Sequence, residues 1–227
     1  MTGLAALVVV AAVFWISRGP SIDRQLANAV KRGDILAVRS LLERGADPNA
    51  HSRTRPPYRP WPIRSLADVH QWVVAKSMPE PFSPTLLMLA AESGWDEICV
   101  VLIAHGARVD ERVHLSGFPA LLHASARGHT STVRVLLEHG ADPNAQNYIS
   151  EGGPALADAA ARNDLVMAKV LLDHGADSNG GYKEGGDILW RAEVNKLHAM
   201  VALLKQYGAK EHPDWGLHYE APKYAQR

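Results

Sequence analysis

A six-residue string recurs along this chain, and its spacing limits the fold more than any other feature. The string reads Leu-Leu-x-x-Gly-Ala with small variations, and its glycines are Gly45, Gly106, Gly140, Gly175 and Gly208. From Gly106 onward the string returns with a period of about 33 residues, which is typical of a solenoid whose repeats pack against their neighbours. The step from Gly45 to Gly106 is almost twice as long, so it holds one period and an insertion. In the fifth copy, Leu203–Ala209, the string is read with one extra residue.

A second marker precedes each of these glycines at a constant distance along the chain. It is Gly33, Gly94 and Gly128, then Asn163, and in the fifth copy Asn195, offset by the extra residue. Glycine and asparagine tolerate the left-handed backbone conformation that a tight turn between two helices needs. Because a Leu/Ala-rich stretch precedes each marker and a Val/Ile/Leu-rich stretch follows it, each repeat is predicted to be a helix–turn–helix unit.

These features make the chain similar to the ankyrin repeat family. The residues that carry the resemblance are Thr85–Ala91, Ala126–His129 and the Gly-Ala-Asp phrases that begin at Gly45, Gly140 and Gly175. The resemblance implies an all-α ankyrin repeat solenoid of about five repeats. The expected repeats are residues 22–50, 84–110, 118–147, 153–179 and 186–210, within a domain of residues 21–210.

The chain also departs from the family pattern. The family's Thr-Pro-Leu-His tetrapeptide is intact nowhere, and Pro119 and Pro154 stand at its threonine position in the third and fourth repeats. We therefore expect ordinary stability rather than that of an idealised repeat array. The tail, Glu211–Arg227, is expected to cover the last repeat.

The N-terminus carries an uninterrupted apolar run, Leu4 to Ile16. We expect residues 1–20 to form a transmembrane or signal-anchor helix, because the uncharged stretch would span roughly 25 Å of a bilayer core of about 30 Å. Two alternatives stay open. A cleaved signal peptide should begin with basic residues, and none precedes Leu4. A buried helix of a soluble protein is the other.

Basic residues follow the apolar run and none precedes it. They include Arg18, Arg24, Lys31 and Arg32. The positive-inside rule then favours a single-pass membrane protein with its ankyrin domain in the cytoplasm. A secreted or periplasmic location after signal cleavage is the alternative.

An insertion, residues 51–83, separates the first two repeats. Its first part holds Arg53, Arg55, Arg59 and Arg64 without an acidic residue, and prolines favour an extended path there. Arg, Tyr and Trp are enriched at interface hot spots, and insertions in solenoids often map to the binding face. The candidate protein-binding residues are Arg53, Arg55, Tyr58, Arg59, Trp61 and Trp72. The alternative is a loop that packs back on its own repeats.

Signals of catalysis or cofactor binding are weak. His105, His139 and His174 recur at one repeat position, and neighbouring copies would lie about 10 Å apart, too far to share a metal ion. No catalytic, cofactor or metal residue is predicted. The one cysteine, Cys99, aligns with Val133, which faces the core, and is expected to be a buried apolar residue. A formal net charge of zero argues against a nucleic-acid partner.

The sequence therefore predicts a non-enzymatic protein–protein interaction module, an ankyrin repeat scaffold or adaptor tethered to a membrane. The alternative is an inhibitor or immunity-type protein that blocks an effector enzyme. The identity of the protein partner and the oligomeric state stay open.

Overall fold

The structure is a computed structural model that describes residues 22–52, 83–113, 118–146, 153–181 and 187–210. Within these ranges the chain forms ten helices in five consecutive pairs, and each pair falls within one of the expected repeats. The prediction of an all-α solenoid is confirmed. The pairs are α2 (Ile22–Arg32) and α3 (Ile35–Glu43), α5 (Leu86–Ser93) and α6 (Asp96–Ala104), α7 (Ala120–Arg127) and α8 (Thr130–Glu138), α9 (Ala155–Ala161) and α10 (Leu165–Asp173), and α11 (Ile188–Val194) and α12 (His198–Gln206).

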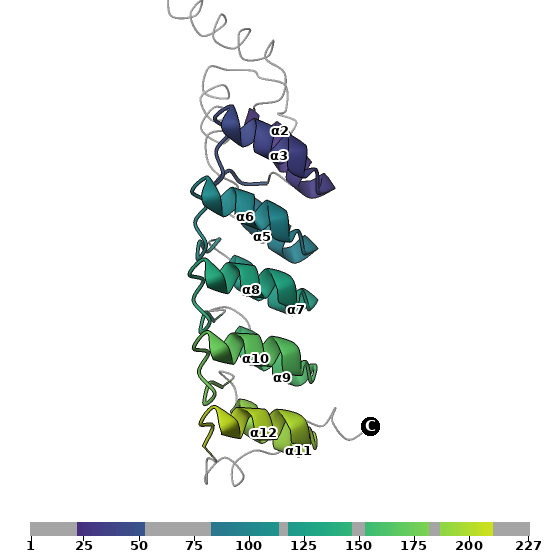
Figure 1. Ribbon diagram of the computed structural model, residues 1–227, viewed down its shortest axis with the longest axis vertical. Coiled ribbons are helices and arrows are strands. Elements are labelled where there is room, and N and C mark those ends of the chain that lie inside the picture. Colours follow the sequence, from purple (N-terminus) through teal and green to yellow (C-terminus); the bar gives the residue numbers. More distant parts are fainter. Residues whose placement is uncertain (1–21, 53–82, 114–117, 147–152, 182–186, 211–227) are drawn as a thin grey trace, which may run out of the picture.

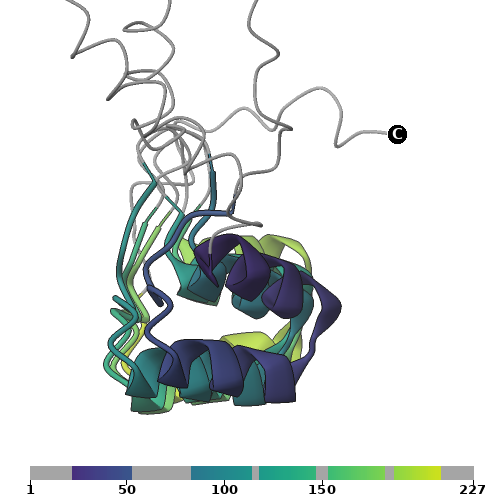
Figure 2. The same ribbon diagram turned by 90° about the horizontal axis from the view of Figure 1, so that it is seen from above.

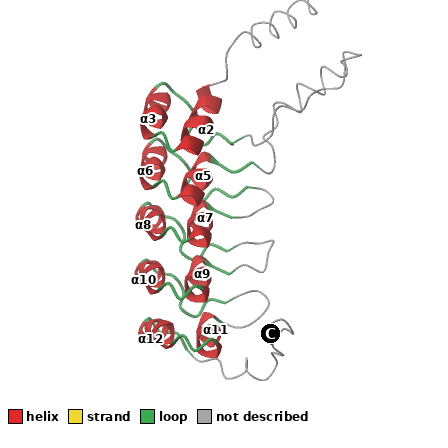
Figure 3. Ribbon diagram, turned by 90° about the vertical axis from the view of Figure 1, so that its right-hand side faces the viewer, coloured by secondary structure: helices red, strands yellow, loops and turns green. Residues whose placement is uncertain are grey.

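The five pairs stack in chain order along one straight axis (Figure 1). Their first helices α2, α5, α7, α9 and α11 form one layer, and their second helices α3, α6, α8, α10 and α12 form the other (Figure 3). The loops between pairs leave together on one side, which we call the hairpin edge. The short turns inside the pairs line up on the opposite side, which we call the turn edge (Figure 2).

The core lies between the two layers and between successive repeats. Each first helix buries one leucine seven residues before its turn residue, and these leucines are at most 1% exposed: Leu26, Leu87, Leu121, Leu156 and Leu189. Each second helix adds another at an equivalent position: Leu41, Leu102, Leu136, Leu171 and Leu204. Because no repeat can bury its apolar face alone, stacking provides most of the stability.

Each turn contains one residue in the left-handed conformation. Gly94 and Gly128 have φ of 72° and 80°, and Asn163 has φ of 55°. In the fifth repeat this residue is Lys196, with φ of 57°, whereas Asn195 has φ of −82°. The assignment to Asn195 was therefore wrong, because the position in the repeat decides the conformation here and outweighs the local preference of asparagine.

The extra residue expected in the fifth repeat does not exist. Helices α9 and α10 begin at Ala155 and Leu165, and α11 and α12 begin at Ile188 and His198, so one and the same period separates both pairs of starts. Leu204 is therefore equivalent to Leu171, and Lys205 to Leu172. The adjacent pair Leu203-Leu204 imitates the repeated string one residue out of register. Leu204 is fully buried and Lys205 is exposed, which fixes the correct register.

Three predicted segments lie outside the described residues: the apolar N-terminal helix of residues 1–20, nearly all of the insertion 51–83, and the tail of residues 211–227. In the part of the chain that the structure describes, no helix combines the length and the apolar character needed to cross a membrane.

Candidate functional site

The exposed side of the first-helix layer is a surface to which all five repeats contribute (Figure 3). On each first helix, the residues five, two and one before the turn residue lie on one face, because helical periodicity places them together. In the three middle repeats the remaining positions near them are buried between the layers. We call this surface the inner face. It consists of Asn28, Lys31, Arg32, Leu89, Glu92, Ser93, His123, Ala126, Arg127, Asp158, Ala161, Arg162, Arg191, Val194 and Asn195.

A half-buried carboxylate lies near the middle of the inner face. Asp158 projects from α9, and the buried hydroxyl of Ser125 on α7 donates a hydrogen bond of 3.1 Å to its Oδ2. Burial raises the pKa of Asp158, while the Ser125 hydrogen bond and the Arg162 charge act in the opposite direction. None of the ion pairs among the described residues includes Asp158. The Ser125 hydrogen bond therefore orients the carboxylate, and the nearby Arg162 charge does not form an ion pair with it.

Arg162 lies close by but directs its donors to main-chain oxygens. Its Nη1 donates to the carbonyl of Ala126 at 3.0 Å and its Nη2 donates to the carbonyl of Ser125. These carbonyls lie at the C-terminal end of α7, where helical hydrogen bonds run out. Arg162 thus ties the fourth repeat to the third and leaves the Asp158 carboxylate available.

The neighbouring position on the third repeat holds an imidazole. His123 packs against Phe118, with ring centroids 5.9 Å apart. Burial lowers the pKa of His123; the Glu92 charge opposes this shift, and the Arg127 charge adds to it. Glu92 and Arg127 themselves form an ion pair between the second and third repeats. The centre of the inner face thus combines two rings in contact, an ion pair and the Asp158 carboxylate, which forms no ion pair. We call the last of these the open carboxylate.

The hairpin edge is held together by asparagines. Asn144 Nδ2 donates to the carbonyl of Gly175 at 3.2 Å, and its Oδ1 accepts from the main-chain N–H of Asp177 at 2.7 Å. Asn49 and Asn179 make equivalent bonds to the repeats that follow them. The second repeat has Asp110 at this position, which accepts from the next repeat but has no amide hydrogen to donate.

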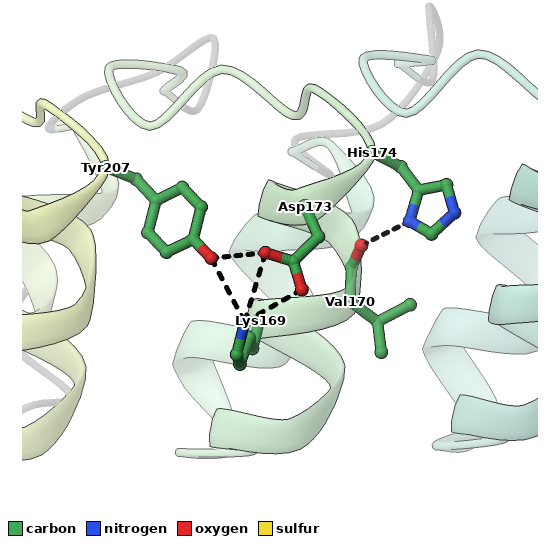
Figure 4. A network of polar contacts seen from close by, with 5 residues as sticks. All are labelled: Lys169, Val170, Asp173, His174 and Tyr207. Carbon is green, nitrogen blue, oxygen red and sulfur yellow. Dashed lines mark hydrogen bonds and ion pairs between the residues drawn. The ribbon is translucent and has the colours of Figure 1, made fainter.

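The recurring histidines have a local structural role. Nδ1 of His105, His139 and His174 each lies 2.8 Å from a carbonyl oxygen one turn earlier in its own helix. At the equivalent position of the fifth repeat, Tyr207 instead reaches back to the fourth repeat (Figure 4). Its hydroxyl donates to Asp173 and accepts from Lys169 at 3.2 Å.

The network of Lys169, Asp173 and Tyr207 lies on the second-helix layer, away from the inner face. Lys169 and Asp173 form an ion pair of 2.8 Å. The hydrogen bond with Asp173 raises the pKa of Lys169, and the same bond lowers the pKa of Asp173. Both charges are already paired, so this network joins two repeats and contrasts with the open carboxylate of Asp158.

Cys99 is fully buried, as predicted, and burial raises the pKa of its thiol to about 12. A thiol of this kind is a poor nucleophile and a poor metal ligand near neutral pH.

The candidate residues of the insertion, Arg53, Arg55, Tyr58, Arg59, Trp61 and Trp72, lie outside the described residues. The structure does describe the points where the insertion leaves and rejoins the solenoid. A bridge pairs His51 with Thr85, and the N–H of Ser52 donates to the carbonyl of Pro84 at 2.9 Å. The insertion therefore starts and ends at the hairpin edge, beside the inner face.

Sequence reasoning did not single out Asp158, Ser125 or Arg162. The signal that could have found Asp158 is the row of residues five before each turn residue, which reads Asn28, Leu89, His123, Asp158 and Arg191. Its hydrogen bond could not be predicted, because the donor is Ser125, a residue of the preceding repeat.

Solenoids built from helix pairs present extended surfaces that bind other proteins. The long, partly polar inner face of this chain is a surface of this kind. Comparisons with known proteins agree. Residues 64–147 match the family of ankyrin repeats (3 copies). The chain is 34% identical to cyclin-dependent kinase 4 inhibitor B of Bos taurus over 125 residues, which is 53% of this chain and 95% of the bovine protein.

Two further relatives are similar. Cyclin-dependent kinase inhibitor 2A of Homo sapiens is 33% identical over 137 residues, or 58% of this chain and 86% of the human protein. An ankyrin repeat-containing protein of Treponema pallidum is 41% identical over 61 residues, or 27% of this chain, and this match spans only 20% of the Treponema protein.

The chain belongs to the ankyrin repeat family. It is a non-enzymatic protein-binding module.

Proposed function

We propose that this protein is an inhibitor, which binds an effector enzyme across its inner face and hairpin edge and blocks it. The support comes from its relatives. Proteins named as cyclin-dependent kinase 4 inhibitor B in Bos taurus and Mus musculus are matched over 95% and 94% of their lengths. A protein kinase is therefore the first class of enzyme to test. A scaffold or adaptor that holds partners without inhibiting them is the second candidate.

The open carboxylate of Asp158 is the observation that carries the proposal. A half-buried charge that forms no ion pair is unfavourable, and burial raises the pKa of this group against the effect of the nearby Arg162 charge. A lysine or arginine side chain of a bound protein would offset that cost with a charge-assisted hydrogen bond. Ser125 holds the carboxylate in one orientation at 3.1 Å, so the site is formed before the partner arrives.

The proposal is tested by incubating the full chain with a panel of purified protein kinases that includes cyclin-dependent kinases. Binding is measured by biolayer interferometry, and activity by phosphate transfer to a peptide substrate. We expect at least one kinase to be bound and to lose activity. Asp158→Asn should weaken both effects by about tenfold or more, because it removes the charge and keeps the shape.

The matched control is Asp173→Asn, which changes the same side chain in the same repeat but on the second-helix layer. It should leave binding to the kinase unchanged. Binding without loss of kinase activity would instead favour the scaffold. If no kinase in the panel is bound, the assignment to kinases is wrong. If Asp158→Asn binds the kinase as tightly as the wild type, the inner face does not contact the kinase.

The insertion is proposed as a second contact with the partner, since its ends are fixed at the hairpin edge next to the inner face. Replacing Arg55, Arg59 and Trp61 together by alanine should weaken partner binding without lowering the melting temperature. An equal loss of stability would show that the insertion packs on its own repeats.

A membrane tether through Leu4–Ile16, with the repeats in the cytoplasm, is proposed from the apolar run and the basic residues that follow it. Resistance of the full chain to alkaline carbonate extraction, together with protease sensitivity of the repeats from the cytoplasmic side only, would support it. Release into the soluble fraction would contradict the tether.

A further inference from the structure

Exposed apolar side chains are concentrated on one edge of the solenoid. Among the described residues the exposed large apolar side chains are Leu36, Trp95, Val100, Leu165, Val166 and Val194. All of them except Val100 lie within three residues of the turn residue of their repeat. Leu36 is 77% exposed, Val166 65% and Val194 58%. Single exposed apolar residues are ordinary, but their gathering along the turn edge is not.

The turn edge is also straight. The five turns line up along the stack axis, on the side opposite to the loops between pairs (Figures 1 and 2). With neighbouring helices about 10 Å apart, the row is about 40 Å long. A straight row of this length can touch a flat surface at several points at once. Exposed carboxylates lie on both edges: Asp47, Asp110, Asp142 and Asp177 on the hairpin edge, and Asp34 and Glu97 on the turn edge.

The length of chain ahead of the first repeat limits how far this edge can lie from a membrane. The apolar run ends at Ile16 and α2 begins at Ile22, so six Cα–Cα steps separate them. Fully extended, these steps reach about 20 Å. Helix α2 has 11 residues and is about 16 Å long, which places its turn, Gly33, about that far from Ile22. A bilayer that holds the apolar run can therefore just be reached by the turn edge.

We infer that the turn edge lies on the surface of a lipid bilayer, with Leu36, Trp95 and Val166 in the interfacial region. This inference rests on the proposed tether and gives it an orientation. Tryptophan favours the interface between lipid and water. Lys31 and Arg32, exposed at the end of α2, lie a few residues from Leu36, where their charged ends meet lipid phosphates.

The orientation has a consequence for partner binding. The hairpin edge points away from the bilayer, and the inner face is perpendicular to the bilayer surface. The Asp158 carboxylate and both ends of the insertion then remain open to a protein from the aqueous side.

Site-directed spin labelling of the full chain tests the inference. The native Cys99 stays unlabelled because it is fully buried and its thiol pKa is raised to about 12. Nitroxides are placed at Leu36→Cys and Val166→Cys on the turn edge, and at Val100→Cys as the matched control on the second-helix layer. Because these side chains are exposed, the substitutions leave the core intact, which far-UV circular dichroism checks.

The labelled chains are reconstituted into vesicles of phosphatidylcholine and phosphatidylglycerol. Collisions of each nitroxide are measured with oxygen, which dissolves in lipid, and with a nickel chelate, which stays in water. We expect the labels at 36 and 166 to collide with oxygen several-fold more than the label at 100, and to be protected from nickel.

Three outcomes would overturn the inference, and they are distinguishable. If the chain is bound to vesicles but all three labels meet nickel equally, the tether stands and the orientation is wrong. If the chain does not associate with vesicles, the tether fails as well. If the labels at 36 and 166 are shielded before vesicles are added, a second copy of the chain covers the turn edge.

Discussion

Glu193 and Lys205 in the fifth repeat occupy positions that the middle repeats fill with buried residues. The equivalents of Glu193 are Ser125 and Ala160, and the equivalents of Lys205 are Leu137 and Leu172; all four are at most 5% exposed. In the fifth repeat the two charged residues form a partly exposed ion pair of 3.1 Å. The outward face of this repeat therefore suits water, whereas the same face of a middle repeat suits another repeat.

The first repeat shows the same change on its own outward side. Gln25 is exposed where Ala120, Ala155 and Ile188 are at most 1% exposed. Arg24, next to it, is also exposed. The comparison teaches that a repeat's place in the stack can be recognised from a few interface positions while its helices stay the same. Terminal repeats with polar outer faces are what a soluble solenoid needs.

The largest effect should follow from copying the end repeat into the middle. Leu137→Lys puts an ammonium group in a face that the next repeat covers, and leaves it without a partner. We expect a loss of about 3 kcal/mol in the free energy of unfolding, measured by urea denaturation. The reverse change, Lys205→Leu, should alter it by about 0.5 kcal/mol or less. Similar losses for both variants would show that middle and end faces are equivalent.

Two glycines in the left-handed conformation, the turn residue Gly94 and Gly208 after α12, should show a smaller contrast. A Cβ at Gly94, where φ is 72°, would lie 2.8 Å from Nδ1 of His129 in the next repeat. At Gly208, where φ is 87°, it would meet nothing within 4 Å. We expect Gly94→Ala to cost about 2–3 kcal/mol and Gly208→Ala about 1 kcal/mol by thermal unfolding. Equal costs would mean that the backbone conformation alone decides, without the neighbouring repeat.

The asparagines of the hairpin edge should give a smaller effect again. Asn144→Asp keeps the acceptor for Asp177 but loses the donor to Gly175, and should cost about 1 kcal/mol in the free energy of unfolding. Asp110→Asn, the reverse change in the second repeat, should raise stability by a similar amount or less. A loss of stability in Asp110→Asn would contradict this account of the edge.

The pH dependence of Asp158 should be the smallest effect. Its pKa in the folded protein is raised above the ordinary 3.8, so folding is favoured when it is protonated, and that contribution is lost as pH rises through the raised pKa. Relative to Asp158→Asn, the wild type should lose under about 1 kcal/mol of stability between pH 4 and pH 7. A wild type that gains stability over this interval would show that the carboxylate is paired in the folded protein.

The sequence predicted the regular features of this molecule and missed the ones that depend on neighbours. The helices follow from apolar periodicity and the repeat period, so they could be placed before the structure was known. Two errors arose in the fifth repeat, where Leu203-Leu204 suggested a false register and Asn195 seemed the natural left-handed residue. The carboxylate of Asp158 could not be found, because the hydrogen bond that orients it comes from Ser125 in another repeat.

The asparagines of the hairpin edge also determine how the solenoid can bend. Asn49, Asn144 and Asn179 each fasten their repeat to the next by two hydrogen bonds, whereas Asp110 can only accept. On the opposite edge, the second and third repeats are joined by Glu92 with Arg127 and by His129. Between these two repeats the hairpin edge also carries a hydrogen bond of 2.7 Å from Nη1 of Arg112 to the carbonyl of Gln146. Every pair of neighbouring repeats is therefore fastened at this edge, and the stack should resist opening there along its whole length. A partner would therefore meet a surface of nearly fixed shape, and the partner would have to fit the solenoid.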